Sequence, residues 1–516
     1  MTDTSQNNKR IAKNTLLLYF RMFFIMAVSL YTSRVILKNL GVEDFGIYNV
    51  VGGIVAMMGV FNQSLAASIQ RYLSYELGKG DIKQLKKVFC VSLTLYALLA
   101  IALIILAETI GLWFLNNKMI IPNDRIVAAN WVYQFSILTC IITLITNVYN
   151  AVIISHERMS YYAYISILEV SLKLVVVYML LVIKSDKLVT YAILMFLVSL
   201  LICLCYIIYC RLKFIETKYK LYRDKTLFKE LFTYSGWNLF GIISGMCKTQ
   251  GLNILLNMFF TPAVNASRGI AVQVNGAVGQ FFNNFYTAVR PQITMYYAKD
   301  DKENFIKLLF GSSKFSVYLI LLVSLPILIE APYIIQMWLG QLPEYVVSFT
   351  RLIILIGAVD AIANPLMTAA QATGHIKLYQ SLVGTTIIFN IPVSYLFLKM
   401  GCNPNVVFII SLSISVLCLF LRIWVVNRLI PYFNINKYIV NVLAISVVVC
   451  VVSSIIPILL TNILNENITS FIIISLSCVI STVLSCYGIG LTKNERTILN
   501  ASIKKIYNKI VRHDRN

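Results

Sequence analysis

Long apolar segments separated by short polar connections recur from one end of the chain to the other. A helix needs roughly 20 apolar residues to cross the hydrocarbon core of a bilayer, and each segment has about that length or more. The pattern predicts an all-α integral membrane protein with about fourteen transmembrane helices. The predicted spans are residues 14–38, 45–74, 88–115, 127–153, 160–183, 188–210, 231–259, 264–296, 315–339, 346–373, 378–399, 404–427, 438–461 and 470–491.

The composition supports this prediction. Of the 516 residues, 59% are hydrophobic and only 13% are charged, whereas soluble domains average about a quarter charged residues. The first apolar run, from Thr15 to Leu37, is longer than the apolar core of a secretion signal and lacks a small-residue cleavage site, so we expect a retained helix. The three His and the mostly span-embedded Cys predict neither a metal site nor a cofactor.

The basic residues predict the topology. The net charge is +22, and in a membrane protein basic loops face the cytoplasm and contact anionic lipid, so no nucleic-acid partner is expected. With the N-terminus inside, Lys and Arg concentrate in the segments on that side: the N-terminal tail, 79–87, 211–229, 299–314 and the C-terminal tail. Both termini are therefore predicted to be cytoplasmic.

The chain divides into two similar halves. Residues at one constant spacing match between them: Arg71 with Arg290, Asp81 with Asp300, and His156 with His375. Such repetition indicates duplication, and an even number of helices per half gives the repeats one orientation. We predict an N-terminal six-helix lobe (1–210), a basic cytoplasmic linker (211–230), a C-terminal six-helix lobe (231–430), two additional helices (431–492) and a basic tail (493–516).

Charged residues inside the predicted spans are the main functional candidates, because each ion at mid-bilayer costs at least about 2.5–3.5 kcal/mol unless it has a partner or a wet cavity. Glu169 and Lys173 lie near the middle of the fifth span. Their spacing of four residues places them on one helix face. They form either a structural ion pair or a titratable, ligand-facing pair.

Three further charges lie deep in other spans: Lys248 in the seventh, Asp360 in the tenth and Arg21 in the first. Lys248 and Asp360 either pair across helices or line a water-filled cavity in which Arg21 and Lys248 attract an anionic ligand. Arg71, Arg290 and Arg422 lie toward the inner face, and Arg34 and Arg268 lie toward the outer face. Snorkelling explains each of these singly, and as a set they would form basic rims of the cavity.

Catalytic motifs are missing from the sequence. It contains no P-loop, HExxH or GxSxG pattern, which argues against ATP hydrolysis and metalloprotease or esterase chemistry. The outer loops are too short for an outward-facing catalytic domain. The architecture is instead typical of a secondary transporter with a midplane site, and not of an enzyme.

The segment RVILKNLGVEDFGIY, residues 34–48, resembles the polysaccharide transporters of the MOP exporter superfamily, the Wzx-type O-antigen flippases. The resemblance implies two six-helix lobes around a central cavity plus two C-terminal helices, in a bacterial inner membrane. It implies that an undecaprenyl-diphosphate-linked oligosaccharide for lipopolysaccharide is flipped by alternating access, driven by an ion gradient or the membrane potential. Membrane lipids and polysaccharide polymerase or assembly proteins are the implied partners.

Family cavities are typically cationic, which suits Arg21, Lys248, Arg71 and Arg290, whereas Glu169 and Asp360 depart from that lining. A multidrug exporter of the same superfamily is the alternative, although its often cationic substrates would favour an acidic cavity. A membrane polysaccharide polymerase is a further alternative, which the short outer loops disfavour.

Overall fold

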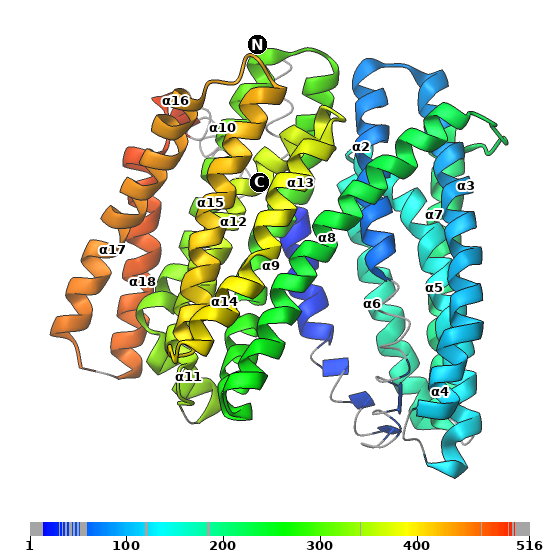
Figure 1. Ribbon diagram of the computed structural model, residues 1–516, viewed down its shortest axis with the longest axis horizontal. Helices are drawn as coiled ribbons and strands as arrows, with labels where there is room; N and C mark the ends of the chain where they lie inside the picture. Colours follow the sequence, from blue (N-terminus) through cyan, green and yellow to red (C-terminus); the bar gives the residue numbers. More distant parts are fainter. Residues whose placement is uncertain are drawn as a thin grey trace, which may run out of the picture. The chain divides into compact units, whose positions relative to one another are not determined.

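The computed structural model describes residues 14–500, apart from residues 30, 33–34, 37–38, 41–43, 45–46, 49–50, 52–58, 119–121, 183–185, 341, 466, 494 and 498–499. This part of the chain is helical and contains no strand (Figure 1). Within it, 11 helices are long and apolar enough to cross a membrane. The predicted all-α membrane architecture is therefore confirmed, whereas the location of the two termini stays a prediction because both lie outside the described residues.

The first compact unit, here the N-terminal unit, comprises Ala12–Ile243 and Thr287–Asp301. Its large aromatic and aliphatic core includes Phe89, Tyr96 and Val148. The unit contains helix Asn14–Ser29, α2 (Gly59–Lys79), α3 (Ile82–Leu106), α4 (Leu112–Lys118), α5 (Ile126–Ser155), α6 (Met159–Val182), α7 (Lys187–Lys213), the start of α8 (Lys225–Phe259) and the end of α9 (Pro262–Ala298).

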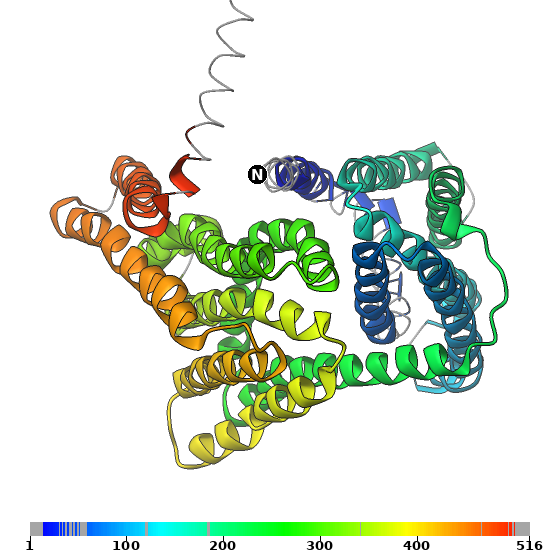
Figure 2. The ribbon, with the colours of Figure 1, turned by 90° about the horizontal axis from the view of Figure 1, so that it is seen from above.

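The second compact unit, here the C-terminal unit, comprises Ser244–Tyr286 and the chain from Lys302 onward. In addition to the rest of α8 and α9, it contains α10 (Lys302–Ile329), α11 (Ala331–Leu339), α12 (Val346–Ala372), α13 (Ile376–Ile388), α14 (Asn390–Lys399), α15 (Asn405–Leu429), α16 (Ile435–Tyr438), α17 (Ile445–Ile463) and α18 (Ile468–Ser485). Helices α17 and α18 lie at the edge of this unit (orange and red in Figure 2). The predicted lobe boundaries stay a prediction; the compact units divide α8 after Ile243 and α9 after Tyr286.

Two predicted spans are interrupted near prolines. The predicted span 315–339 breaks at Glu330, where α10 ends and α11 begins. Pro332 lies in the first turn of α11, where its missing N–H is tolerated, so the helix restarts there. The predicted span 378–399 breaks at Phe389, three residues before Pro392. Pro392 cannot donate the backbone hydrogen bond that would continue α13 into α14.

A buried tyrosine hydroxyl packs against a glycine at each of two π-helical turns. In η1 (Ala107–Gly111), Tyr133 Oη donates to the carbonyl of Ala107 at 2.8 Å. In η5 (Cys486–Gly490), Tyr318 Oη donates to the carbonyl of Gly490 at 3.2 Å. Each turn ends in a glycine because a Cβ there would meet the phenol: 2.0 Å from Tyr133 Oη and 2.7 Å from Tyr318 Oη.

Two of the residue pairs that match in sequence occupy different positions in the turns between helices. Glu157 and Gly374 hold the left-handed φ in the α5–α6 and α12–α13 turns. His156 precedes the first of these residues and His375 follows the second, so the two histidines occupy different positions in their turns. Gly80 and Asp300 hold the left-handed φ after α2 and α9. Asp81 follows Gly80, so its positional counterpart is Asp301 rather than Asp300.

The predicted linker belongs to the N-terminal unit and packs against its helices α3 and α5. The imidazole of His156 stacks on Phe214 with ring centres 4.1 Å apart, and its Nε2 lies 2.5 Å from Glu216 Oε1. The amide of Lys220 donates to Cys90 Sγ at 3.3 Å. These contacts attach the stretch after α7 to the ends of α5 and α3.

Glu216→Gln is expected to loosen the linker. Burial raises the pKa of Glu216, but the His156 hydrogen bond, a backbone hydrogen bond and the His156 charge together lower it more, so the pKa lies below the ordinary 4.5. The contact therefore contributes stability above that value, and the contribution is lost as the pH falls through the lowered pKa. Trypsin should cut after Lys218 and Lys220 several-fold faster in the variant. The difference in melting temperature between the unmodified protein and the variant should persist at neutral pH and vanish in acid; a difference independent of pH would contradict this account.

Candidate functional site

A polar pocket lies in the N-terminal unit between the first helix and α6. It has a volume of about 350 Å³. The first helix contributes guanidinium and hydroxyl groups, and α6 contributes a hydroxyl, a carboxylate and an ammonium group. The lining residues are Arg21, Ile25, Ser29, Thr32, Ser166, Glu169, Val170 and Lys173. The structure thus brings together three of the charged residues that the sequence singled out.

Glu169 and Lys173 form the ion pair that their spacing predicts. Lys173 Nζ donates to Glu169 Oε1 at 2.5 Å. The two side chains are 38% and 34% exposed, respectively, so the pair lies on the wall of the pocket rather than in the core. Because the two charges cancel, the pocket keeps one positive charge, which is that of Arg21.

Arg21 retains unused hydrogen-bonding capacity. Its guanidinium carbon lies 4.4 Å from the centre of the Tyr162 ring, a cation–π contact. Its Nε is buried and has no hydrogen-bond partner among the described residues. A buried donor without an acceptor is costly, so this nitrogen is well suited to an acceptor supplied from the pocket.

Removing one partner of the Glu169–Lys173 pair is expected to be worse than removing both. Glu169→Gln leaves an uncompensated ammonium group in an apolar helix, and Lys173→Met leaves an uncompensated carboxylate. The double variant leaves neither charge. We therefore expect each single variant to lower the yield of folded protein in the membrane, and the double variant to restore it. Size-exclusion profiles of detergent extracts measure this; a double variant with the sum of the single losses would contradict pairing.

A second polar cluster lies in the C-terminal unit. Lys248 Nζ in α8 donates to Ser415 Oγ in α15 at 3.1 Å. Asp360 in α12 lies opposite Arg422 in α15, with Oδ1 3.9 Å from Nη1. Of the two alternatives for Lys248 and Asp360, the pairing across helices is therefore wrong: Arg422 is the nearest cation to Asp360 in the described part of the chain, because it projects from α15 toward α12.

The remaining basic candidates separate into two places. Arg71 is only 7% exposed, and its guanidinium lies over the rings of Tyr72, Tyr75 and Tyr234 at 4.6, 4.8 and 5.7 Å. Arg290 lies within electrostatic reach of the same Tyr234. Arg71 is thus buried among aromatic rings and does not snorkel. Arg268, in the C-terminal unit, donates through Nη2 to the carbonyl of Thr249 at 2.5 Å.

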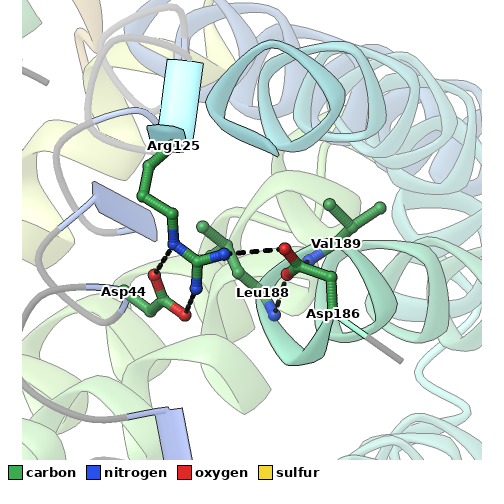
Figure 3. Close-up of polar contacts among 5 residues, drawn as sticks. All are labelled: Asp44, Arg125, Asp186, Leu188 and Val189. Atoms are coloured by element: carbon green, nitrogen blue, oxygen red, sulfur yellow. Dashed lines mark hydrogen bonds and ion pairs between the residues drawn. The ribbon is translucent and has the colours of Figure 1, made fainter. Parts of the chain in front are cut away.

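An ion-pair network that the sequence did not predict joins Asp44, Arg125 and Asp186 in the N-terminal unit (Figure 3). Arg125 Nε donates to Asp44 Oδ1 at 2.9 Å, and its Nη1 donates to Asp186 Oδ2 at 2.7 Å. Asp186 also caps α7 by accepting from the amides of Leu188 and Val189. Asp44 belongs to the segment 34–48, and the family resemblance of that segment was the sequence signal that could have pointed to this network. The network fixes the ends of helices rather than forming a pocket.

No protein-family model and no curated protein matches the chain. Solved structures do. A structure described as the outward-facing conformation of a multidrug resistance MATE family transporter of the MOP superfamily matches with a TM-score of 0.70 at 13% identity, covering 82% of this chain and 96% of that chain. A MATE structure in the bent conformation matches with a TM-score of 0.70 at 13% identity, covering 83% and 98%.

The MATE transporter ClbM in complex with Rb⁺ matches with a TM-score of 0.64 at 14% identity, covering 80% of this chain and 94% of that chain. Each match extends over most of both chains, and each is at an identity that reports on the fold alone. The chain therefore has the fold of MATE family transporters of the MOP superfamily.

Proposed function

We propose that this protein is a secondary transporter that exports an amphipathic anion across the bacterial cytoplasmic membrane. The charge balance of the spanning helices is the supporting observation. Among the described residues, Glu169 pairs with Lys173 and Asp360 lies opposite Arg422. Arg21 and Lys248 form no ion pair there, so the charge left over in both units is positive. A positive charge in a polar pocket favours an anionic ligand.

The substrate that we propose is an undecaprenyl-diphosphate-linked oligosaccharide repeat unit, flipped by alternating access. A diphosphate cannot cross hydrocarbon unaided, because its charge is too costly to desolvate. Guanidinium and ammonium groups replace its hydration with charge-assisted hydrogen bonds. The resemblance of residues 34–48 to O-antigen flippases supports the same substrate. The membrane potential supplies about 2.3 kcal/mol per charge per 100 mV as a driving force.

Multidrug export is the second candidate. The observation in its favour is the fold: one of the matching structures is described as a multidrug resistance transporter. This observation supports small-molecule export more directly than it supports a lipid-linked substrate. Arg21 and Lys248, which form no ion pair in the part of the chain that the structure describes, are unfavourable for the cationic drugs that such an exporter often carries.

A strain that lacks this gene distinguishes the two candidates. For a flippase, surface polysaccharide is lost and lipid-linked repeat units accumulate on the cytoplasmic side, and the intact gene reverses both effects. For a multidrug exporter, the polysaccharide is normal and sensitivity to drugs increases. Single repeat units that cross but do not polymerise would contradict both candidates and indicate a polymerase.

A further inference from the structure

We propose that the C-terminal unit binds one small monovalent anion of the halide class beside Arg422. The site is built from α8, α12, α13 and α15, and it includes Lys248, which the proposed function also uses as a substrate contact. Every residue in it belongs to the described part of one compact unit.

One face of α15 forms the floor of the site. Ser415, Cys418 and Arg422 are spaced three and four residues apart, so they lie along the same side of the helix. Lys248 reaches this face through its hydrogen bond to Ser415. Cys418 is buried between the charges, within electrostatic reach of Arg422, Lys248 and Asp360.

The site contains more buried donors than acceptors. The Arg422 side chain is 12% exposed, and its Nε is buried without a hydrogen-bond partner in the described part of the chain. Tyr379, in α13, is 1% exposed, and its buried hydroxyl lies within side-chain hydrogen-bonding reach of Arg422. Asp360 is 3.9 Å from Arg422, too far for a hydrogen bond. A Tyr379 hydroxyl that accepts from Arg422 keeps its own proton to donate. That proton and the buried Arg422 Nε–H call for an acceptor, because an unpaired buried donor costs roughly 1–3 kcal/mol.

The charge of the cluster favours an anion with a single negative charge. Lys248 and Arg422 are cationic and Asp360 is anionic, so the three side chains sum to one positive charge. A halide brings the sum to zero and accepts from Arg422 and Tyr379 without having to donate. A doubly charged anion would leave a net negative charge in an apolar environment, which is unfavourable.

The carboxylate of Asp360 lies on the open side of the site. Its side chain is 43% exposed, whereas Arg422 and Tyr379 are covered. Asp360 therefore competes with an entering anion for Arg422. This arrangement predicts that neutralising Asp360 strengthens anion binding, a change that a purely structural role of the cluster would not produce.

Thermal unfolding of the purified full-length protein in detergent tests the proposal. Sodium bromide or chloride is titrated into sodium gluconate at constant ionic strength. Because a ligand that binds only the folded state stabilises it by mass action, we expect a saturable rise in melting temperature. Arg422→Gln and Tyr379→Phe should lower the apparent affinity roughly tenfold or more, since each removes a donor. Asp360→Asn should raise the affinity. Arg428→Gln is the matched control, because Arg428 ends the same helix beside Trp424 and outside the cluster.

Equal melting temperatures in gluconate and halide, or an unchanged halide response in Tyr379→Phe, would overturn the proposal. If Arg422→Gln does not fold, Tyr379→Phe and Asp360→Asn still decide the question through the opposite signs of their effects. A titration with inorganic phosphate identifies the source of the anion. Phosphate that displaces bromide with higher affinity would overturn the halide assignment and give the site to a phosphate-bearing ligand; phosphate that fails to compete supports it.

Discussion

Gly111→Ala is expected to remove most of the folded protein from the membrane. A Cβ at this position would lie 2.0 Å from Tyr133 Oη. Tyr133 is fully buried, and its hydroxyl is held by the carbonyl of Ala107 at 2.8 Å, so the ring has no free space to enter. Overpacking of a core costs about 1–3 kcal/mol or more, and displacing the hydroxyl adds the loss of a buried hydrogen bond. Size-exclusion profiles and melting temperatures of detergent extracts measure the effect.

Two variants test the cause of this loss. Tyr133→Phe in the Gly111→Ala background removes the clashing oxygen, and the next ring atom lies 3.2 Å from the added Cβ, so we expect partial recovery. Gly245→Ala in α8 is the matched control, because an added Cβ there meets nothing within 4 Å. A Gly111→Ala protein as abundant and as stable as Gly245→Ala would show that the hydroxyl does not shape the π turn.

Lys248→Met is expected to reduce export at least tenfold while leaving the protein folded. Lys248 forms no ion pair among the described residues, and its Nζ donates to the neutral Ser415 hydroxyl. Removing its charge therefore leaves no carboxylate unpaired. A charge-assisted hydrogen bond contributes about 1.5–3 kcal/mol, which corresponds to roughly tenfold or more in affinity. Transport by cells that contain equal amounts of each variant is the measurement.

Two control variants separate the effect of the charge of Lys248 from the effect of its position in the chain. Lys248→Arg keeps the positive charge and should retain most of the transport. Lys307→Met removes an ammonium group that pairs with Glu303 on an exposed surface, and should have no effect. Full transport by Lys248→Met at normal abundance would exclude Lys248 as a ligand-contacting residue.

Local sequence patterns predicted the helices well. The span predicted at 127–153 forms α5, from Ile126 to Ser155, and the span predicted at 346–373 forms α12, from Val346 to Ala372. Hydropathy reports helices reliably because a lipid-exposed backbone must satisfy its own hydrogen bonds. The break at Glu330 was missed because the apolar run continues through it, although Pro332 was a visible signal.

Side-chain partners were predictable only within one helix. The spacing of Glu169 and Lys173 fixes their relative position, and the structure confirms their pair. The Lys248–Asp360 pairing was wrong because hydropathy does not give the rotation of α8 and α12 about their axes. The position of Arg422 opposite Asp360 was not predicted for the same reason.

Contacts between segments that are far apart in the chain could not be predicted, because they leave no recognisable pattern in the sequence. Gly111 and Tyr133 look ordinary in their helices, and only their approach in space explains the π turn. The network of Arg125 with Asp44 and Asp186 likewise joins residues far apart in the chain, and the sequence drew attention only to the segment that contains Asp44. The matched spacing of His156 and His375 was misleading, because helix ends rather than residue counts align the turns.

Lipid flipping by the purified protein in proteoliposomes is the most direct test of the proposed function. The vesicles carry a fluorescent undecaprenyl-diphosphate-linked oligosaccharide, and a membrane-impermeant quencher reports how much of the label reaches the opposite leaflet. The account predicts protein-dependent flipping that is abolished by Lys248→Met and retained by Lys307→Met. Absence of flipping by a folded protein that moves a cationic drug under the same gradient would contradict it and establish the multidrug candidate instead.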